Sequence, residues 1–121
     1  MRVDIVTPER QLVSTEADRV QLPGTEGEMT VMENHAPTVT TLRPGLVTIA
    51  GDAYLVTGGF AEISEGGTSI LAEHAVPRAD VSREMLETLR TEAEAAVDTA
   101  PDKTAARQRV NDIATLMAQI A

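Results

Sequence analysis

The spacing of the apolar residues changes once along this chain, near Arg78, and this change limits the possible folds more than any other feature. Before it, short apolar runs alternate with turn-forming residues, which is typical of the strands of a β-sandwich or barrel. After it, apolar residues recur at steps of three to five, as on one face of a helix. The runs that predict strands are Val3 to Thr7, Val20 to Leu22, Met29 to Met32, Val39 to Leu42, Leu46 to Ile49, Ala53 to Thr57, Phe60 to Ile63 and Ser69 to Leu71.

We therefore expect a β-sandwich of about ten short strands over residues 1–79 and an antiparallel α-helical hairpin over residues 80–121. Asp80 or Ser82 can cap the first helix. Residues 99–102 interrupt the helical spacing, and so short a break favours two antiparallel helices. The expected apolar stripes comprise Val81, Met85, Leu86, Leu89, Ala93, Ala96 and Val97 on the first helix, and Ala106, Val110, Ile113, Met117 and Ile120 on the second.

Glycine and proline mark the expected turns between the strands. Gly51-Asp52 and Glu65-Gly66-Gly67 are typical of hairpin turns, because glycine supplies the positive φ that such turns need. Arg43-Pro44-Gly45 predicts a turn with proline at its second position. Gly58-Gly59 lies within a longer apolar stretch and predicts a bulge or bend there.

The composition argues against several classes of partner and of site. The net charge of −9 opposes binding to nucleic acid or anionic lipid, and two aromatic residues, Tyr54 and Phe60, are too few for a base-stacking surface. The absence of cysteine rules out disulfides and thiolate metal sites. No run of 18 apolar residues occurs, and the first residues are strand-like rather than a signal peptide, so we expect any membrane association to be indirect.

The stretch from Gly24 to Pro37 is the strongest candidate for a docking site. Two glycines, Gly24 and Gly27, place Glu26 and Glu28 on a tight exposed turn that offers negative charge to a partner. Pro37 then places His35 on a loop or at a strand edge. An ordinary surface hairpin is an equally good interpretation of these residues taken alone.

Catalytic groupings are poor. His35 and His74 are the only histidines and are far apart in sequence, so we expect no metal site. Glu26 and Glu28 could serve a small hydrolase, but an exposed turn lacks the apolar pocket that separates an acid from a base. No phosphate-binding loop and no nucleophile elbow occurs. We expect neither an enzyme nor a cofactor.

The order of several motifs points to a family. They are Val-Asp-Ile-Val-Thr-Pro-Glu-Arg from residue 3, Leu-Pro-Gly-Thr-Glu-Gly-Glu from residue 22, His-Ala-Pro from residue 35, Leu-Arg-Pro-Gly from residue 42, Tyr-Leu-Val-Thr-Gly-Gly-Phe from residue 54 and Leu-Ala-Glu-His-Ala from residue 71. Followed by a helical hairpin, this series resembles the epsilon subunits of F-type ATP synthases over essentially the whole chain.

The resemblance implies a non-catalytic subunit of the central stalk, which couples the membrane-embedded c-ring to the gamma subunit during rotary ATP synthesis. Glu28, with Glu26 and Gly27 beside it, matches the position that contacts the c-ring. Thr7 and the His35-Ala36-Pro37 loop match positions near gamma. The absence of a presequence favours a bacterial chain, so the expected place is the cytoplasmic face of a bacterial inner membrane, reached through the complex.

The hairpin departs from the nucleotide-binding pattern of the family, in which an aliphatic residue is followed by Asp, two further residues, Arg and Ala. Ser82 and Met85 replace the Asp and the Arg. A shifted register over residues 86–91 restores an acid and a base, but with Glu for Asp and Thr for Ala. We therefore expect no ATP binding of regulatory affinity.

The hairpin of some relatives also contacts the alpha/beta head and inhibits ATP hydrolysis through basic residues on the second helix. In this chain those residues are Lys103, Arg107 and Arg109, and residues 111–121 contain none. We expect weak or absent inhibition. A free-standing β-sandwich module that binds a soluble partner through the acidic turn is the alternative function.

Overall fold

The structure, a computed structural model, describes residues 1–120; Ala121, the last residue of the predicted hairpin, lies outside the described residues. The chain divides into two compact units, Met1–Arg78 and the residues from Ala79 onward. The first unit contains the strands β1 (Arg2–Val6), β2 (Gln11–Glu16), β3 (Arg19–Gly24), β4 (Gly27–Met32), β5 (Thr38–Leu42), β6 (Gly45–Ile49), β7 (Asp52–Val56), β8 (Gly59–Ser64), β9 (Gly67–Ala72) and β10 (Ala75–Pro77).

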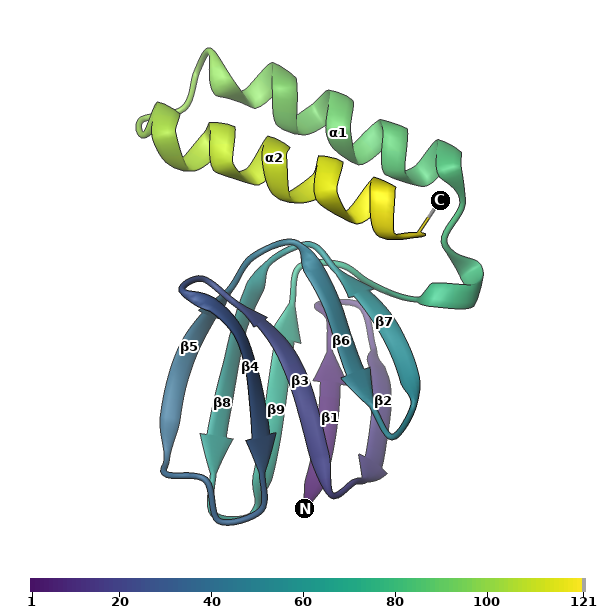
Figure 1. The fold of residues 1–121 in the computed structure, drawn as a ribbon, viewed down its shortest axis with the longest axis vertical. Helices are drawn as coiled ribbons and strands as arrows, with labels where there is room; N and C mark the ends of the chain where they lie inside the picture. Colours follow the sequence, from purple (N-terminus) through teal and green to yellow (C-terminus); the bar gives the residue numbers. More distant parts are fainter. Residues whose placement is uncertain (121) are drawn as a thin grey trace. The chain divides into compact units, whose positions relative to one another are not determined.

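The strands form one continuous sheet that folds over into two layers (Figure 1). One layer has the order β4-β3-β6-β7-β10 and the other the order β5-β8-β9-β1-β2. The layers meet where Gly24 of β3 pairs with Leu42 of β5. Among the strands of residues 1–120, only β1 and β9 pair in parallel, and all other strand pairs are antiparallel. The predicted β-sandwich is confirmed.

The core between the layers is built from aliphatic side chains. Because successive strand residues point to opposite faces, every second residue of a strand enters this core. Its buried members are Val3, Ile5, Ala17, Val20, Leu22, Val31, Leu42, Val47, Ile49, Val56, Ala61, Ile63, Ile70 and Ala72.

Two strands, β2 and β10, were not predicted from the spacing of the apolar residues. No residue of β2 is buried, and β10 is only three residues long, so neither contains an apolar run that would predict it. The hairpin turn between β6 and β7 consists of Ala50 and Gly51, with φ of 49° and 87°, rather than the expected Gly51-Asp52. Positive φ at both positions is typical of the type I′ turns that join many two-residue hairpins.

Gly58 and Gly59 form the connection along which the chain passes from one layer to the other. Their φ angles are 141° and 123°, values that favour glycine. A Cβ on Gly59 would overlap the carbonyl oxygen of Leu71. The pair is therefore a bend between β7 and β8, one of the two geometries predicted for it.

A short 3₁₀ turn (Arg78–Asp80) spans the boundary between the units, and the second unit contains two packed helices, α1 (Arg83–Val97) and α2 (Lys103–Ile120). Ser82 is the N-cap of α1, and its hydroxyl accepts a hydrogen bond of 3.1 Å from the amide of Met85. Leu86, Ala93, Ile113 and Leu116 are buried. The expected stripes omitted Leu116 and included Ala96, which is exposed.

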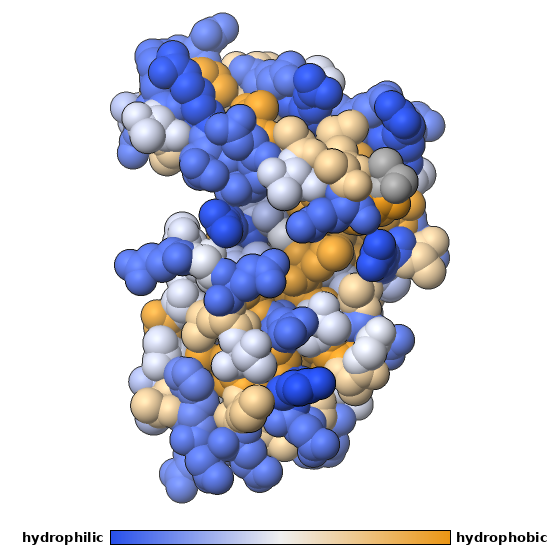
Figure 2. Space-filling view, in the orientation of Figure 1, coloured by the Kyte–Doolittle hydropathy of each residue, from blue (hydrophilic) through white to orange (hydrophobic). Residues whose placement is uncertain are grey.

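Hydrophilic residues cover much of the visible surface of the two helices (Figure 2). Neither α1 nor α2 combines the length and the hydropathy that a membrane-spanning helix needs.

Candidate functional site

The acidic turn lies at the tip of the hairpin formed by β3 and β4. Gly24 pairs with Gly27 across the turn residues Thr25 and Glu26. Gly27 is the first residue of β4 and has a φ of 135°. Glu26 and Glu28 are both exposed, and within residues 1–120 neither carboxylate forms an ion pair. The turn therefore presents two unpaired negative charges to solvent.

Thr25 attaches this turn to the neighbouring layer. Its hydroxyl and its amide both donate to the carbonyl oxygen of Thr41, at 2.7 Å and 3.0 Å. The amide of Arg43 in turn donates to the carbonyl of Pro23 at 3.0 Å. These bonds fix the position of Glu26 and Glu28 relative to β5, although both side chains are exposed.

A groove runs between the turn and β5. Its lining comes from Gly24 to Met29 on one side and from Thr38 to Thr41 on the other. The groove is open to solvent and has no apolar enclosure around Glu26 or Glu28. Without such an enclosure the two carboxylates have no environment that would assign one as acid and the other as base.

The loop from Glu33 to Pro37 lies at the opposite end of β4 from the turn. Asn34 has a φ of 70°, the amide of His35 donates to the carbonyl of Met32 at 3.2 Å, and Nδ1 of His35 lies 2.7 Å from the carbonyl oxygen of Ala36. His35 is half-buried, while Ala36 and Pro37 are exposed. The five steps of β4 from Gly27 to Met32 separate the loop from the acidic turn by roughly 17 Å, at about 3.4 Å per step.

Thr7 does not lie beside this loop. It closes the turn between β1 and β2, where its hydroxyl donates to the carbonyl of Arg10 at 3.2 Å. The strand register places Val6 next to Leu71, Leu71 next to Phe60, and Phe60 next to Thr41. Thr7 is thus level with the end of β5 that contacts the acidic turn, whereas His35 to Pro37 precede the other end of β5.

An exposed apolar face lies between these two ends. Val39, Phe60 and Leu71 are 69%, 42% and 37% exposed, unusually high values for such residues, and Val6 beside them is half-buried. We call these four residues the outer patch. They come from β5, β8, β9 and β1 and point away from the core. The outer patch was not predicted from the sequence, although each of its members occupies a strand position out of phase with the core residues.

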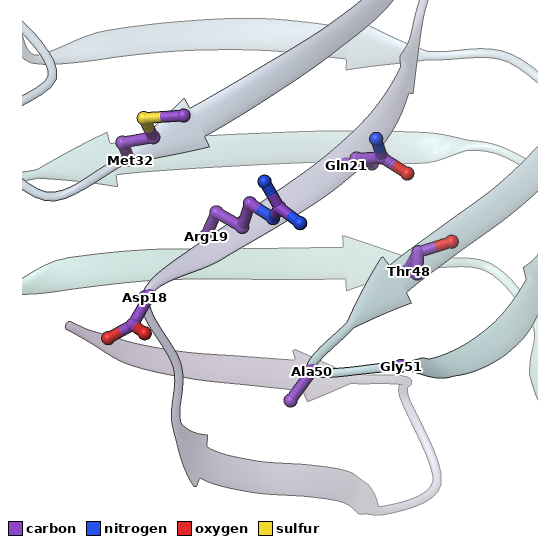
Figure 3. Close-up of a pocket in the computed structure, with 7 residues that line it drawn as sticks. All are labelled: Asp18, Arg19, Gln21, Met32, Thr48, Ala50 and Gly51. Carbon is purple, nitrogen blue, oxygen red and sulfur yellow. The ribbon is translucent and has the colours of Figure 1, made fainter.

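A second hollow lies on the outer face of the other layer (Figure 3). Arg19 and Gln21 on β3, Thr48 on β6 and Met32 on β4 line it, and the Arg19 guanidinium extends toward Gln21. This mixture of polar groups contains no nucleophile paired with a base. Among residues 1–120, no group of His, Asp and Glu is arranged to hold a metal ion.

The residues at the positions of the nucleotide-binding motif described above have structural roles in α1. Ser82 caps the helix, and Met85 is half-buried. In the shifted register, the side chains of Glu87 and Arg90 are engaged with other partners: Arg83 contacts Glu87 at 3.1 Å, and Arg90 contacts Glu94 at 2.9 Å.

One of the three basic residues on α2 also has a structural role. The ammonium group of Lys103 donates to the carbonyls of Val97 and Asp98, at 3.3 Å and 3.0 Å. These carbonyls lie at the C-terminal end of α1, where the carbonyl groups of a helix have no amide of a following turn to bind. Lys103 therefore ties the start of α2 to the end of α1.

Comparison with known proteins assigns the family. The model of the β-sandwich domain of the ATP synthase delta/epsilon chain matches residues 1–78. The chain belongs to the ATP synthase epsilon chain family. It is 44% identical to the ATP synthase epsilon chain of Fuscovulum blasticum, over 98% of this chain and 94% of that one. It is 46% identical to the epsilon chain of Cereibacter sphaeroides strain ATCC 17025, with the same two coverages.

Solved structures agree with this assignment. A chain of the Euglena gracilis mitochondrial ATP synthase, in a structure of OSCP, F1 and the c-ring, matches with a TM-score of 0.73 and 26% identity over 98% of this chain and 80% of that one. A chain from the central stalk and c-ring of the Tetrahymena thermophila enzyme has the same fold, with a TM-score of 0.67 and 15% identity over 99% and 92% of the two chains. As an epsilon chain, the protein is a non-catalytic subunit, in agreement with the expectation from its sequence.

Proposed function

We propose that this epsilon chain works in the central stalk of an F-type ATP synthase and transmits torque between the c-ring and the gamma subunit. The separation of two different surfaces at the two ends of β4 supports this role most strongly. One end carries the exposed carboxylates of Glu26 and Glu28, and the other leads into the His35-Ala36-Pro37 loop. A coupling subunit needs two such surfaces on a rigid support.

The acidic turn is the proposed contact with the c-ring. Glu28 and Glu26 would face basic groups of the polar loops of the ring, and Gly27 permits the turn that presents them. Both carboxylates are solvated, so their pairing with the ring contributes orientation and register more than affinity. The hydrogen bonds of Thr25 to β5 give the turn the rigidity that this role requires.

The gamma contact is proposed to extend over the outer patch. Thr7 and the His35-Ala36-Pro37 loop lie near opposite ends of one layer, so a single partner that reaches both must cover the face between them. That face carries Val39, Phe60 and Leu71, and exposed apolar residues grouped in this way are typical of protein interfaces. Membrane association then follows from assembly, at the cytoplasmic face of a bacterial inner membrane.

Site-specific crosslinking tests both contacts. Because the chain has no cysteine, Glu28→Cys and His35→Cys each provide a single attachment point for a photoreactive maleimide. In the assembled synthase we expect position 28 to crosslink to the c-ring and position 35 to gamma. Glu65→Cys is the matched control for position 28, since Glu65 is an exposed glutamate on another hairpin turn. Equal crosslinking of positions 28 and 65 to the ring would refute the assignment.

We further propose that the hairpin binds no ATP with regulatory affinity. Ser82 and Met85 lack the acid and the base of the family motif, and the ion pairs Arg83–Glu87 and Arg90–Glu94 engage the charged groups of the shifted register. Isothermal titration of the full chain with ATP should show no micromolar binding. Micromolar affinity that disappears in Arg90→Ala would instead identify the shifted register as a site.

The alternative of a free-standing binding module makes a different prediction. An epsilon chain that acts in the stalk co-purifies with gamma in equal amount, whereas a module for a soluble partner does not. Stoichiometric recovery with gamma would therefore decide for the central stalk.

A further inference from the structure

One edge of β5 remains without a partner strand over most of its length. On its other edge β5 pairs with β8 from Thr38 to Leu42. Toward β3 it has a single bridge, between Leu42 and Gly24. On either side of this bridge, the Thr41 carbonyl accepts a hydrogen bond from the Thr25 amide, and the Arg43 amide donates one to the Pro23 carbonyl. The amide and carbonyl groups of every second residue in a strand face the same edge. Those of Val39 therefore point away from β8, as the carbonyl of Thr41 does. No hydrogen-bond partner for them is found within residues 1–120.

The groove described above runs along this free edge. Its walls are residues 24–29 and 38–41, and Glu26 and Glu28 are its only charged residues. Val39, which is 69% exposed, belongs both to the groove and to the outer patch. The free edge therefore combines unpaired backbone groups with negative charge and an adjoining apolar surface.

We propose that the free edge of β5 accepts an extended, basic segment of a partner protein as an additional β-strand. The amide and carbonyl of Val39 and the amide of Thr41 form backbone hydrogen bonds with the segment, and Glu26 and Glu28 contact its Lys or Arg side chains. In this mode of binding, main-chain hydrogen bonds provide affinity and side chains provide selectivity. The inference rests on the proposed contact of the acidic turn, because it uses Glu26 and Glu28, and it adds to that contact a mode of recognition through the backbone of β5.

The charge of the groove argues for a basic partner rather than a second copy of this chain. Pairing of two such edges would bring two sets of acidic side chains together, and like charges across neighbouring strands are destabilising. The edge is also short. Thr25 already bonds the Thr41 carbonyl at one end, and Pro37, which has no amide hydrogen, precedes β5 at the other.

NMR titration of the ¹⁵N-labelled full chain tests this proposal with a synthetic probe. The probe is an acetylated and amidated peptide of alternating Lys and Val residues. We expect shifts of the Val39 and Thr41 amides and slower hydrogen exchange at Val39. The same peptide methylated at every backbone nitrogen keeps its charges but loses its donors, and it should bind roughly tenfold or more weakly. Equal binding of the two peptides would overturn the proposal.

Charge is tested on the protein side. Glu26→Gln combined with Glu28→Gln should weaken binding of the Lys-Val peptide several-fold. Glu9→Gln combined with Glu65→Gln, which removes the same charge from two other exposed turns, should leave it unchanged. Amide chemical-shift changes confined to residues 26–28, without slower hydrogen exchange at Val39, would indicate charge attraction alone and would refute strand addition. Either failure leaves the crosslinking test of the stalk role unaffected.

Discussion

Single residues fix the places where the chain reverses or crosses between layers. Gly59 is the clearest case, since its φ of 123° and its closeness to the Leu71 carbonyl both exclude a side chain. Glycine adopts this φ readily, and only glycine has no Cβ that would overlap the Leu71 carbonyl oxygen. The sequence marks this position as a bend, but only the packing of β8 against β9 shows why an alanine cannot replace it.

The first prediction follows from this overlap. Gly59→Ala should lower the free energy of unfolding by about 2 kcal/mol or more, because β8 and β9 must separate locally to admit the methyl group. Gly66→Ala is the matched control: a Cβ there meets nothing within 4 Å. Urea denaturation of the two variants measures the difference. Equal loss of stability in both would show that the Leu71 carbonyl moves aside easily.

A second prediction at this scale concerns the outer patch. Phe60→Ser should weaken association with gamma by about tenfold, since it removes a large apolar side chain from the centre of the proposed interface. Met32→Ser is the control, because Met32 is also exposed, at 54%, but lies on the other layer. Binding to purified gamma is compared for both variants. A greater loss with Met32→Ser would move the interface to the layer that contains β4.

Among the elements, the two helices depend on polar contacts at their ends. Ser82 caps α1, and Asp102 accepts a hydrogen bond of 3.1 Å from the amide of Ala105 at the start of α2. Lys103 completes the connection through the carbonyls of Val97 and Asp98. The sequence predicts a cap at Asp80 or Ser82 and the break at residues 99–102, because both are local signals. It does not predict the bonds of Lys103, which depend on how the two helices meet.

The prediction for this connection uses hydrogen exchange. Lys103→Met should raise the exchange rate of amides in residues 98–102 roughly two- to fivefold, since it removes two hydrogen bonds to carbonyls at the end of α1. Arg107→Met, at an exposed position on the same helix, is the control and should have no effect there. An unchanged rate in Lys103→Met would show that the antiparallel packing alone holds the connection.

At the scale of the whole molecule, the apolar core of the β-unit is made entirely of its own residues. Every buried residue of the β-core lies between Val3 and Ala72. We therefore expect the fragment 1–78 to fold by itself and to unfold cooperatively in urea. A broad, non-cooperative transition would show that the β-unit needs the helices for its stability.

The same truncation tests regulation. Deletion of the residues after Arg78 should leave ATP hydrolysis by the assembled head nearly unchanged, because Lys103 is engaged within the hairpin and no basic residue follows Arg109. Steady-state hydrolysis with the full and the truncated chain measures the effect. A several-fold rise on truncation would contradict weak inhibition.

Most strands, both helices and the acidic turn could be predicted from the sequence, because alternation, helical spacing, caps and glycine turns act over a few residues. Which side chains share a surface depends on strand pairing and is known only from the fold. Val39, Phe60 and Leu71 meet through pairings between β5, β8 and β9, and β1 pairs with β9 from the far end of the unit. Strand register across such separations depends on the whole sheet, so the separation of Thr7 from His35 and the free edge of β5 became visible only in the fold.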